Sequence, residues 1–257
     1  MPEAMALWAA VSGVSVGEAW LRRDEPKAPE IVAKYQHAVD QLARGVPFAY
    51  AVGRTGFRAL DLAIDSRALI PRPETEGLVD LVLAGHATGL VADIGTGCGC
   101  IALALATEGR FDRVVAVEQS AAAAALAREN VAQVAPRTPV EILEGNLLAP
   151  LMDRGGRYRV IVSNPPYLTA AEYAELGSSV ADHEPPEALV SGSDGLAATR
   201  ILFAEAAPLL EPGGLLALEI DERRGDAIRA LAGAYGWLVE IHADLFGCPR
   251  YALAKEE

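Results

Sequence analysis

The sequence predicts an α/β fold, in which a mostly parallel sheet of seven strands is covered by helices on both faces and preceded by a small helical region. Strands are expected near residues 90–94, 113–117, 140–144, 159–163, 214–220, 237–242 and 250–254. Helix-forming sequence lies between most of them, and this alternation is typical of a parallel sheet covered on both faces. The last two runs are separated by only a short gap, which predicts that the final strand runs antiparallel.

Residues 1–50 are expected to form a small helical domain, with residues 31–42 as its clearest amphipathic helix. Residues 1–16 are apolar, but the first cation is Arg22 and no long apolar run follows, so they are expected to form a helix and not a signal peptide. Residues 51–71 alternate in polarity and are expected to be a β-hairpin linker, with strands at 55–60 and 62–64. Residues 72–257 then form the α/β domain.

The composition favours a soluble cytoplasmic enzyme. The net charge of −13, with no run of Lys or Arg longer than two, argues against a protein that holds nucleic acid stably by neutralising phosphates. No stretch reaches the ~18 apolar residues of a membrane span. Cys98, Cys100 and Cys248 are few enough to be reduced thiols, and the four His are scattered, so we expect no metal.

A glycine-rich turn follows the expected strand at 90–94. Glycines in such a turn let a ligand approach the backbone, and the next helix presents free N–H groups. The alternative is a dinucleotide site, but its third glycine would stand at residue 100, which is Cys100. An acid at the strand end suits a ligand that carries an amine better than it suits pyrophosphate. The expected binding residues of this 93–99 turn are Asp93, Gly95, Thr96, Gly97 and Gly99.

Two further polar residues follow the next two expected strands. Glu118 lies at about the distance beyond Gly95 at which an acid meets ribose hydroxyls in a βαβ nucleotide fold, and its carboxylate can accept from both hydroxyls. The alternative is a solvated strand end. Asn146 could reach an adenine edge, although Asn after Gly145 is also an ordinary turn residue.

The residues Asn164, Pro165, Pro166 and Tyr167, here called the 164–167 tetrapeptide, directly follow the apolar run 159–163. Open α/β sheets build their active sites at such strand exits. The prolines have no N–H, so this backbone offers mainly carbonyls, and Asn164 adds a side-chain carbonyl. Acceptors beside the Tyr167 ring suit a planar NH2 group, either an amide or an exocyclic base amine. The alternative is a turn that only ends the strand.

With these motifs the chain resembles the HemK/PrmC family of protein-(glutamine-N5) methyltransferases. The resemblance starts at residues 45–53, continues through Ile-Pro-Arg-Pro-Glu-Thr-Glu at 70–76, and includes both motifs above, His183-Glu184-Pro185 and residues 212–215. It implies the Rossmann-like fold of class I S-adenosylmethionine-dependent methyltransferases. It also implies S-adenosyl-L-methionine as cofactor, S-adenosyl-L-homocysteine as product, and a protein glutamine as methyl acceptor. The leading acceptor is the Gly-Gly-Gln loop of a peptide chain release factor, recognised by the N-terminal helices.

The resemblance also implies roles for individual residues. Asn164 and the Pro165 carbonyl would accept the two amide N–H groups, Tyr167 would pack on the flat amide, and Asn164 would also adjoin the cofactor. Arg72 and Glu74 would lie over the mouth of the cofactor and substrate site, although Arg72-Pro73-Glu74 also has the sequence of a helix start. Pro166 would contact the substrate with the rest of the 164–167 tetrapeptide.

Three departures from the family leave alternatives open. The N-terminal region is short, Asn146 stands where Asp is common, and His183 stands where an aromatic residue is common. The alternatives are glutamine methylation of another protein, such as a ribosomal protein, or N6-adenine methylation of nucleic acid. A third alternative is a cofactor-binding module without turnover.

Overall fold

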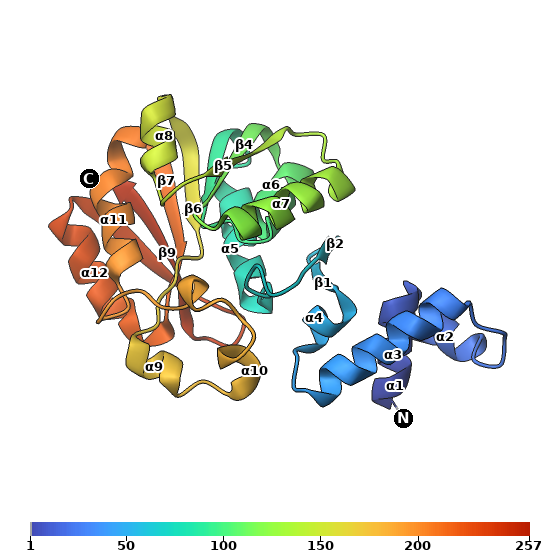
Figure 1. Ribbon diagram of the computed structural model, residues 1–257. Coiled ribbons are helices and arrows are strands. Elements are labelled where there is room, and N and C mark those ends of the chain that lie inside the picture. The colour runs from blue at the N-terminus through green and yellow to red at the C-terminus, as the bar shows by residue number, and fades with distance from the viewer. Residues whose placement is uncertain (1) are drawn as a thin grey trace.

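The computed structural model describes residues 2–257 and contains a seven-stranded sheet in the order β5-β4-β3-β6-β7-β9-β8. Met1, with which the expected helical region begins, lies outside the described residues. The strands are β3 Thr88–Ile94, β4 Arg110–Glu118, β5 Val140–Glu144, β6 Tyr158–Ser163, β7 Leu210–Glu219, β8 Trp237–Ala243 and β9 Pro249–Glu256. Figure 1 shows this sheet between two groups of helices, with the N-terminal helices as a separate arm.

Strand directions confirm the predicted topology. The pairs β5-β4, β4-β3, β3-β6 and β6-β7 are parallel, whereas β9 is antiparallel to both β7 and β8. The strand at 140–144 has its predicted bounds, and β7 begins earlier than predicted, at Leu210 rather than at residue 214. The class I methyltransferase arrangement expected from the sequence is therefore present.

The sheet has a hydrophobic core on each face because successive strand residues point to opposite sides. Val114 and Ala116 of β4 belong to one core, whereas Val115 and Val117 belong to the other. The first core is completed by α5 Pro73–Gly85, α6 Cys100–Glu108 and α7 Ala121–Val134, and the second by α8 Ala149–Arg154, α11 Ala197–Glu205 and α12 Gly225–Ala234. Two short helices, α9 Ala170–Ala174 and α10 Ser178–Ala181, follow the 164–167 tetrapeptide. Single 3-10 turns lie at Pro186–Ala188, Ala207–Leu209 and Glu222–Arg224.

The N-terminal arm consists of α1 Pro2–Ser12, α2 Val16–Leu21, α3 Pro29–Ala43 and α4 Phe48–Val52. It has its own small core around Leu7, Ala38 and Ala51, and the Trp8 and Tyr35 rings pack with centroids 5.4 Å apart. No helix among residues 2–257 is long and apolar enough to cross a membrane.

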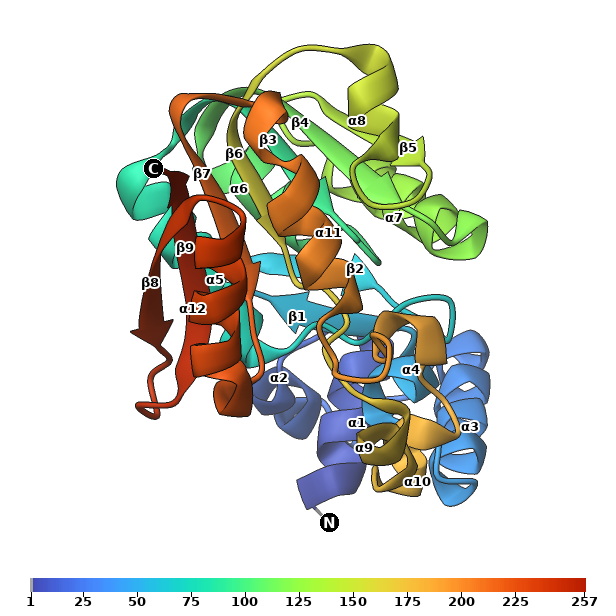
Figure 2. The ribbon, with the colours of Figure 1, turned by 90° about the vertical axis from the view of Figure 1, so that its left-hand side faces the viewer.

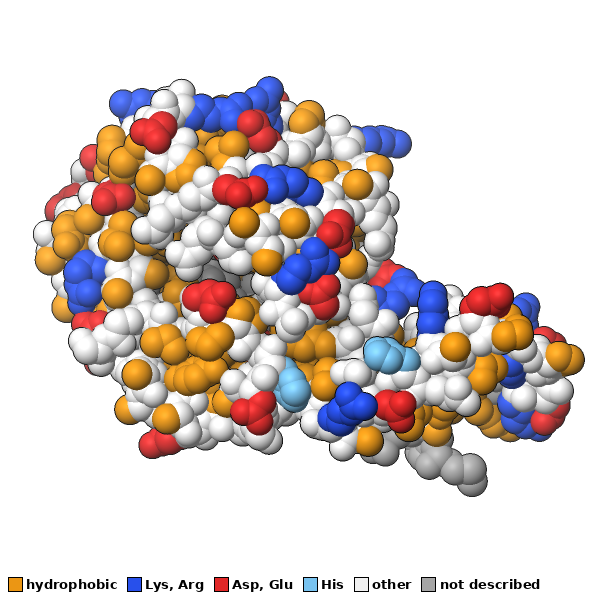
Figure 3. Space-filling view, in the orientation of Figure 1, with side chains coloured by type: hydrophobic (Ala, Val, Ile, Leu, Met, Phe, Trp, Pro, Cys, Tyr) orange, Lys and Arg blue, Asp and Glu red, His pale blue; other side chains and the backbone are white. Residues whose placement is uncertain are grey.

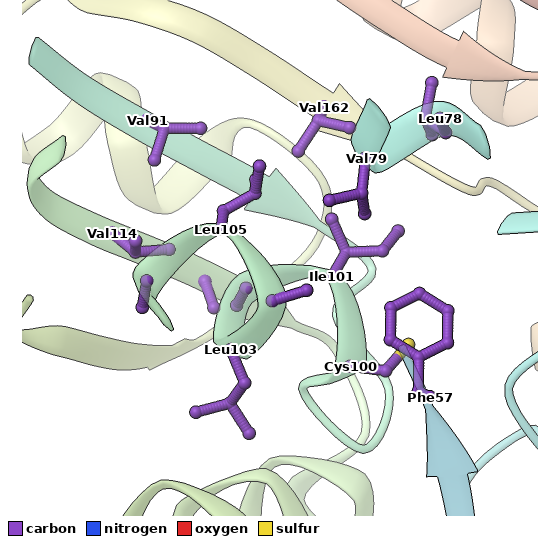
Figure 4. Close-up of a cluster of buried hydrophobic side chains, with 14 of the residues drawn as sticks. Phe57, Leu78, Val79, Val91, Cys100, Ile101, Leu103, Leu105, Val114 and Val162 are labelled. Carbon is purple, nitrogen blue, oxygen red and sulfur yellow. The ribbon is translucent and has the colours of Figure 1, made fainter. Parts of the chain in front are cut away.

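A two-stranded hairpin, β1 Arg54–Phe57 and β2 Leu60–Ala63, joins the arm to the α/β domain. Its turn lies at residues 58–59, so the expected strand bounds of 55–60 and 62–64 were wrong by a few residues. Arg58 takes a positive φ of 52°, its N–H donates to Glu76, and its guanidinium pairs with Glu108 at 2.7 Å. These contacts with α5 and α6 set the turn and are not visible in the local pattern. Figure 4 shows Phe57 inserted beside Cys100 and Ile101, which anchors the hairpin in the main core.

Candidate active site

The site lies at the edge of the sheet where the parallel strands end, because the 93–99 turn, Glu118, Asn146 and the 164–167 tetrapeptide lie at the carboxyl ends of four of them. Figure 2 shows this edge facing the N-terminal helices. A cavity of about 350 Å³ opens there, which is within the usual range of small-molecule sites. It is lined by five residues of the expected cofactor set, namely Gly95, Gly97, Glu118, Asn146 and Asn164, and by Pro166.

Two glycines form the floor of this cavity, which is the larger of the two cavities at the site. Gly95 and Gly97 have φ values of 72° and 57°, in the left-handed region that favours glycine. A Cβ built on either one would meet no atom within 4 Å, so it would project into open space. Side chains there would occupy space that a ligand could use. Gly99 also has positive φ, but its missing Cβ faces Ala127 and Leu103, away from the cavity.

Asp93 and Thr96 lie beneath the floor and not on it. Asp93 is fully buried, and one of its oxygens accepts from the Thr96 hydroxyl at 2.5 Å and from the Ala102 N–H at 3.0 Å. Burial raises the pKa of Asp93 to about 7, against the lowering effect of those two hydrogen bonds. The arrangement ties the turn to the first turn of α6, so Asp93 shapes the floor, and its other oxygen has no hydrogen-bond partner within the described residues.

Glu118 lines the larger cavity from the end of β4. Its two oxygens accept from Gly97 N–H and Ser120 N–H, each at 2.9 Å, which fixes the plane of the carboxylate. Each oxygen of a carboxylate can accept a further hydrogen bond, so a diol could still be held. Asn146 also lines the cavity; its backbone carbonyl accepts from the Ala149 N–H, and its side chain makes no hydrogen bond within the described residues.

A second cavity of about 200 Å³ adjoins the first, and the 164–167 tetrapeptide separates them. Asn164 and Pro166 line both cavities, whereas Pro165 and Tyr167 line the second. Burial, together with the nearby Glu219 carboxylate, raises the pKa of Tyr167 to about 12, so its hydroxyl is neutral at physiological pH.

Arg72 forms one wall of the smaller cavity. Its guanidinium donates to both oxygens of Glu184, at 2.7 and 2.9 Å, and Glu184 is only 3% exposed. This ion pair fastens the start of α5 to the segment after α10. Glu74 lines neither cavity within the described part of the chain, and its backbone carbonyl accepts from the Tyr251 hydroxyl at 2.6 Å.

Polar groups at the junction of the two cavities are oriented by the protein. Asn164 Nδ2 donates to Thr75 Oγ1 at 3.2 Å, and Thr75 donates to the buried Glu219 carboxylate at 2.7 Å. Among residues 2–257, the Pro165 carbonyl and Asn164 Oδ1 accept no hydrogen bond. Sequence reasoning singled out neither Thr75 nor Glu219. The sequence held one signal for Glu219, which is that it ends an apolar strand. Glu118 likewise ends β4, and Asp93 stands one residue before the end of β3.

Charged side chains of both signs surround the site, and the larger cavity is lined by both Arg67 and Glu118. Figure 3 shows Lys and Arg mixed with Asp and Glu over the face drawn, and hydrophobic side chains gathered over the α9–α10 region. Leu176 and Val180 of that region line the smaller cavity. No three His, Cys, Asp or Glu side chains within the described residues gather so as to hold a metal ion.

Comparison with known proteins adds two family matches. Residues 74–181 match the methyltransferase small domain, and residues 2–53 match the PrmC N-terminal domain. The chain is 44% identical over 223 residues to a release factor glutamine methyltransferase of Xylella fastidiosa, covering 85% of this chain and 80% of that one. It is 39% identical over 238 residues to the protein of the same name from Deinococcus radiodurans, covering 91% and 84%. Among solved structures, the hMettl16 catalytic domain in complex with an RNA hairpin superposes with a TM-score of 0.64 at 20% identity, covering 91% of this chain and 94% of that one.

Proposed function

The chain belongs to the family of release factor glutamine methyltransferases, and from this membership we propose the reaction that its site carries out. The enzyme transfers a methyl group from S-adenosyl-L-methionine to the side-chain amide nitrogen of a glutamine. The acceptor is the glutamine of the Gly-Gly-Gln loop of a peptide chain release factor.

The larger cavity suits the cofactor in shape and in chemistry. The open space above Gly95 and Gly97 leaves room for a ligand against the backbone, and the fixed Glu118 carboxylate offers acceptors to a ribose diol. Asn146 is free to meet the edge of an adenine ring. Asp93, Thr96 and Gly99 contribute indirectly, by holding the turn in shape.

The observation that carries the proposal is the place of Asn164 at the junction of the two cavities. A methyl donor in the larger cavity and an amide in the smaller one would meet at this residue. The bound cofactor supplies an electrophilic methyl group on a sulfonium sulfur. The protein must bring the amide nitrogen to that methyl group in line, and proximity of this kind can supply much of the rate acceleration.

An amide nitrogen is a poor nucleophile because its lone pair is delocalised into the carbonyl. Asn164 Oδ1 and the Pro165 carbonyl are acceptors without partners in the described structure, and they can hold the two N–H bonds of the glutamine amide. These dipoles are oriented before positive charge develops on nitrogen, so they stabilise the transition state without reorganising. After transfer the positively charged nitrogen releases one proton to solvent water, because the carbonyl acceptors can hold its N–H bonds but are too weakly basic to take the proton. Tyr167 and Pro166 give the amide a flat apolar wall, and Arg72 holds the mouth in place through Glu184.

The N-terminal arm is proposed to dock the protein substrate. It presents exposed apolar side chains at its far end, with Trp20 55% and Leu21 76% exposed. Exposed large apolar residues on a rigid helical element are typical anchors of protein interfaces.

The test is to incubate the protein with methyl-labelled cofactor and a release factor, and then to map the labelled peptide. We expect the label on the Gly-Gly-Gln glutamine, and none when that glutamine is replaced by alanine. Ribosomal proteins, single-stranded DNA and duplex DNA serve as competing acceptors in parallel reactions. Label on adenine in DNA, or on a ribosomal protein alone, would overturn the proposed substrate.

A further inference from the structure

Three side chains from separate segments form a hydrogen-bonded chain that ends at Asn164. Asn164 follows β6, Thr75 lies in the first turn of α5, and Glu219 is the last residue of β7. Asn164 Nδ2 donates to Thr75 Oγ1 at 3.2 Å, and Thr75 Oγ1 donates to Glu219 Oε2 at 2.7 Å. Thr75 and Glu219 are each 2% exposed, so water does not compete for these bonds.

The chemistry of the three groups gives the chain one direction. An ionised carboxylate can only accept hydrogen bonds, so the Thr75 hydroxyl must donate its single proton to Glu219. Only lone pairs of Thr75 Oγ1 then remain for Asn164, and only the NH2 group of the Asn164 amide can donate to them. A rotated amide would set its oxygen against the Thr75 oxygen, with no proton between them. The Asn164 oxygen is therefore held on the side away from Thr75.

We propose that Thr75 and Glu219 are positioning residues for methyl transfer, which fix the amide of Asn164 so that its oxygen faces the acceptor amide. The inference deepens the proposed function and rests on it for the identity of the acceptor. Neither residue lines a cavity within the described structure, so both act through Asn164 and touch neither reactant.

The surroundings of Glu219 are consistent with an ionised group under assay conditions. Burial raises its pKa to about 7, while donation from Thr75 and the charges of Arg250 and Arg72 oppose the rise and Glu74 adds to it. Burial raises the pKa of both Tyr167 and Tyr251 to about 12, and the Glu219 charge adds to the rise in each. At pH 8.5 the tyrosines are neutral and the carboxylate is ionised, so assays at this pH present the chain in its acceptor form.

A merely structural role is the competing explanation, because the same bonds also tie α5 to the sheet. Two near-isosteric changes separate the explanations. Thr75→Val keeps the volume and removes the hydroxyl, and Glu219→Met keeps the length of the side chain and removes the acceptor, so that the Thr75 proton can turn toward Asn164. Thr75→Ser keeps the hydroxyl and is the matched conservative variant.

With release factor as substrate at pH 8.5, Thr75→Val and Glu219→Met should lower kcat by about 10–100-fold, the scale for a misplaced reacting group. KM for the release factor and Kd for S-adenosylhomocysteine should stay within about twofold, since neither residue lines a cavity. Thr75→Ser should recover most of kcat. A purely structural role would instead lower the melting temperature and leave kcat of the folded fraction near that of the unmodified protein.

A second measurement does not depend on turnover. The side-chain NH2 protons of Asn164, observed by ¹⁵N NMR, should exchange slowly in the unmodified protein and in Thr75→Ser, and fast in Thr75→Val. If the unmodified protein labels no release factor but the exchange rates follow this pattern, the proposed function is wrong, whereas the fixed orientation of the Asn164 amide is confirmed. If Thr75→Val keeps full kcat, or leaves the exchange of the Asn164 amide protons unchanged, the positioning role is wrong.

Discussion

Asn164 is the residue on which the proposed reaction depends most directly. Asn164→Ala removes one of the two acceptors at the junction of the cavities, so kcat should fall by about 10²–10³-fold, as for the loss of one preorganised polar partner. Affinity for S-adenosylmethionine should change little, because Glu118 and the glycine turn remain. Single-turnover kinetics and calorimetry on the same preparation measure the two effects. Asn164→Asp should also be slow, since it brings a charge to a site shaped for a neutral amide. Near-normal turnover of Asn164→Ala would mean that the tetrapeptide only ends a strand.

Glu118 should carry a large part of the affinity for the cofactor. Glu118→Ala removes a charged acceptor and also frees the Gly97 and Ser120 N–H groups that it holds, so binding should weaken by about 1–3 kcal/mol. Glu144 is the matched control, because it pairs with Glu118 in register at the end of β5 but does not line the cavity. Calorimetry with S-adenosylhomocysteine should therefore show weaker binding for Glu118→Ala and unchanged binding for Glu144→Ala. Equal affinities in both variants would remove Glu118 from the site.

Asp93 should make the protein less stable as the pH rises from about 4 to about 7. Its folded pKa is raised from 3.8 to about 7, so over this range the unfolded chain releases the proton while the folded protein keeps it. The unfolded state therefore binds fewer protons, and the free energy of unfolding falls as pH rises. Below the unfolded pKa of 3.8, Asp93 is protonated in both the folded and the unfolded state, and its contribution to stability is fully present.

Asp93→Asn isolates this effect from other titrating groups, including Glu219. The stability of the natural protein relative to Asp93→Asn should decrease by a few kcal/mol across the window, since one pKa unit corresponds to about 1.4 kcal/mol. Urea unfolding of both proteins at four pH values between 4 and 7.5 gives the difference directly. A difference that does not vary with pH would mean that Asp93 titrates in the folded protein as it does in the unfolded chain.

At the scale of elements, α5 is held against β9 by a contact that requires glycine. A Cβ at Gly77 would overlap the Tyr251 hydroxyl, which donates to the Glu74 carbonyl at 2.6 Å. Gly77→Ala should therefore destabilise the protein by about 1–3 kcal/mol, as overpacking does, despite the gain of about 1 kcal/mol in helix propensity. Gly85→Ala, at the end of the same helix, meets no atom within 4 Å and should not destabilise. Urea denaturation compares them, and Tyr251→Phe should partly rescue Gly77→Ala. Equal stability of the two alanine variants would contradict the contact.

The sheet could be predicted from the sequence because each strand carries its own signal. The strand at 140–144, for example, carries Val140, Ile142 and Leu143 between Pro139 and Gly145, so its limits follow from local pattern. The hairpin was less predictable, since the position of its turn depends on Arg58 reaching Glu76 and Glu108, which lie far along the chain. Long-range contacts of this kind produce no periodic pattern of apolar residues in the local sequence.

The site could be predicted in part for the same reason. Gly95, Gly97, Glu118, Asn146 and Asn164 lie at or just beyond the ends of strands, and the topology brings strand ends together at one edge. The depth of Asp93 beneath the floor could not be predicted, because it depends on how α6 approaches the turn. The link from Glu219 through Thr75 to Asn164 was equally hidden, since it joins three elements through hydrogen bonds only.

At the scale of the whole molecule, the arm and the α/β domain have separate cores, joined by the hairpin. The arm can therefore carry a docking function that is independent of the cofactor site. The double change Trp20→Ser and Leu21→Ser removes two exposed apolar side chains from its far end, without touching the core residues Leu7, Ala38 and Ala51.

The KM for the release factor should rise about tenfold in this double variant, which corresponds to about 1.4 kcal/mol of lost docking energy. The melting temperature and the affinity for S-adenosylhomocysteine should not change, because both side chains are far from the glycine turn and from either large core. Leu238→Ser is the matched control, since Leu238 is 61% exposed on the outer strand β8, at the end of the strand away from the site. A rise in KM that appeared equally in Leu238→Ser would indicate general loss of solubility or stability. No rise in either variant would mean that Trp20 and Leu21 do not dock the protein substrate.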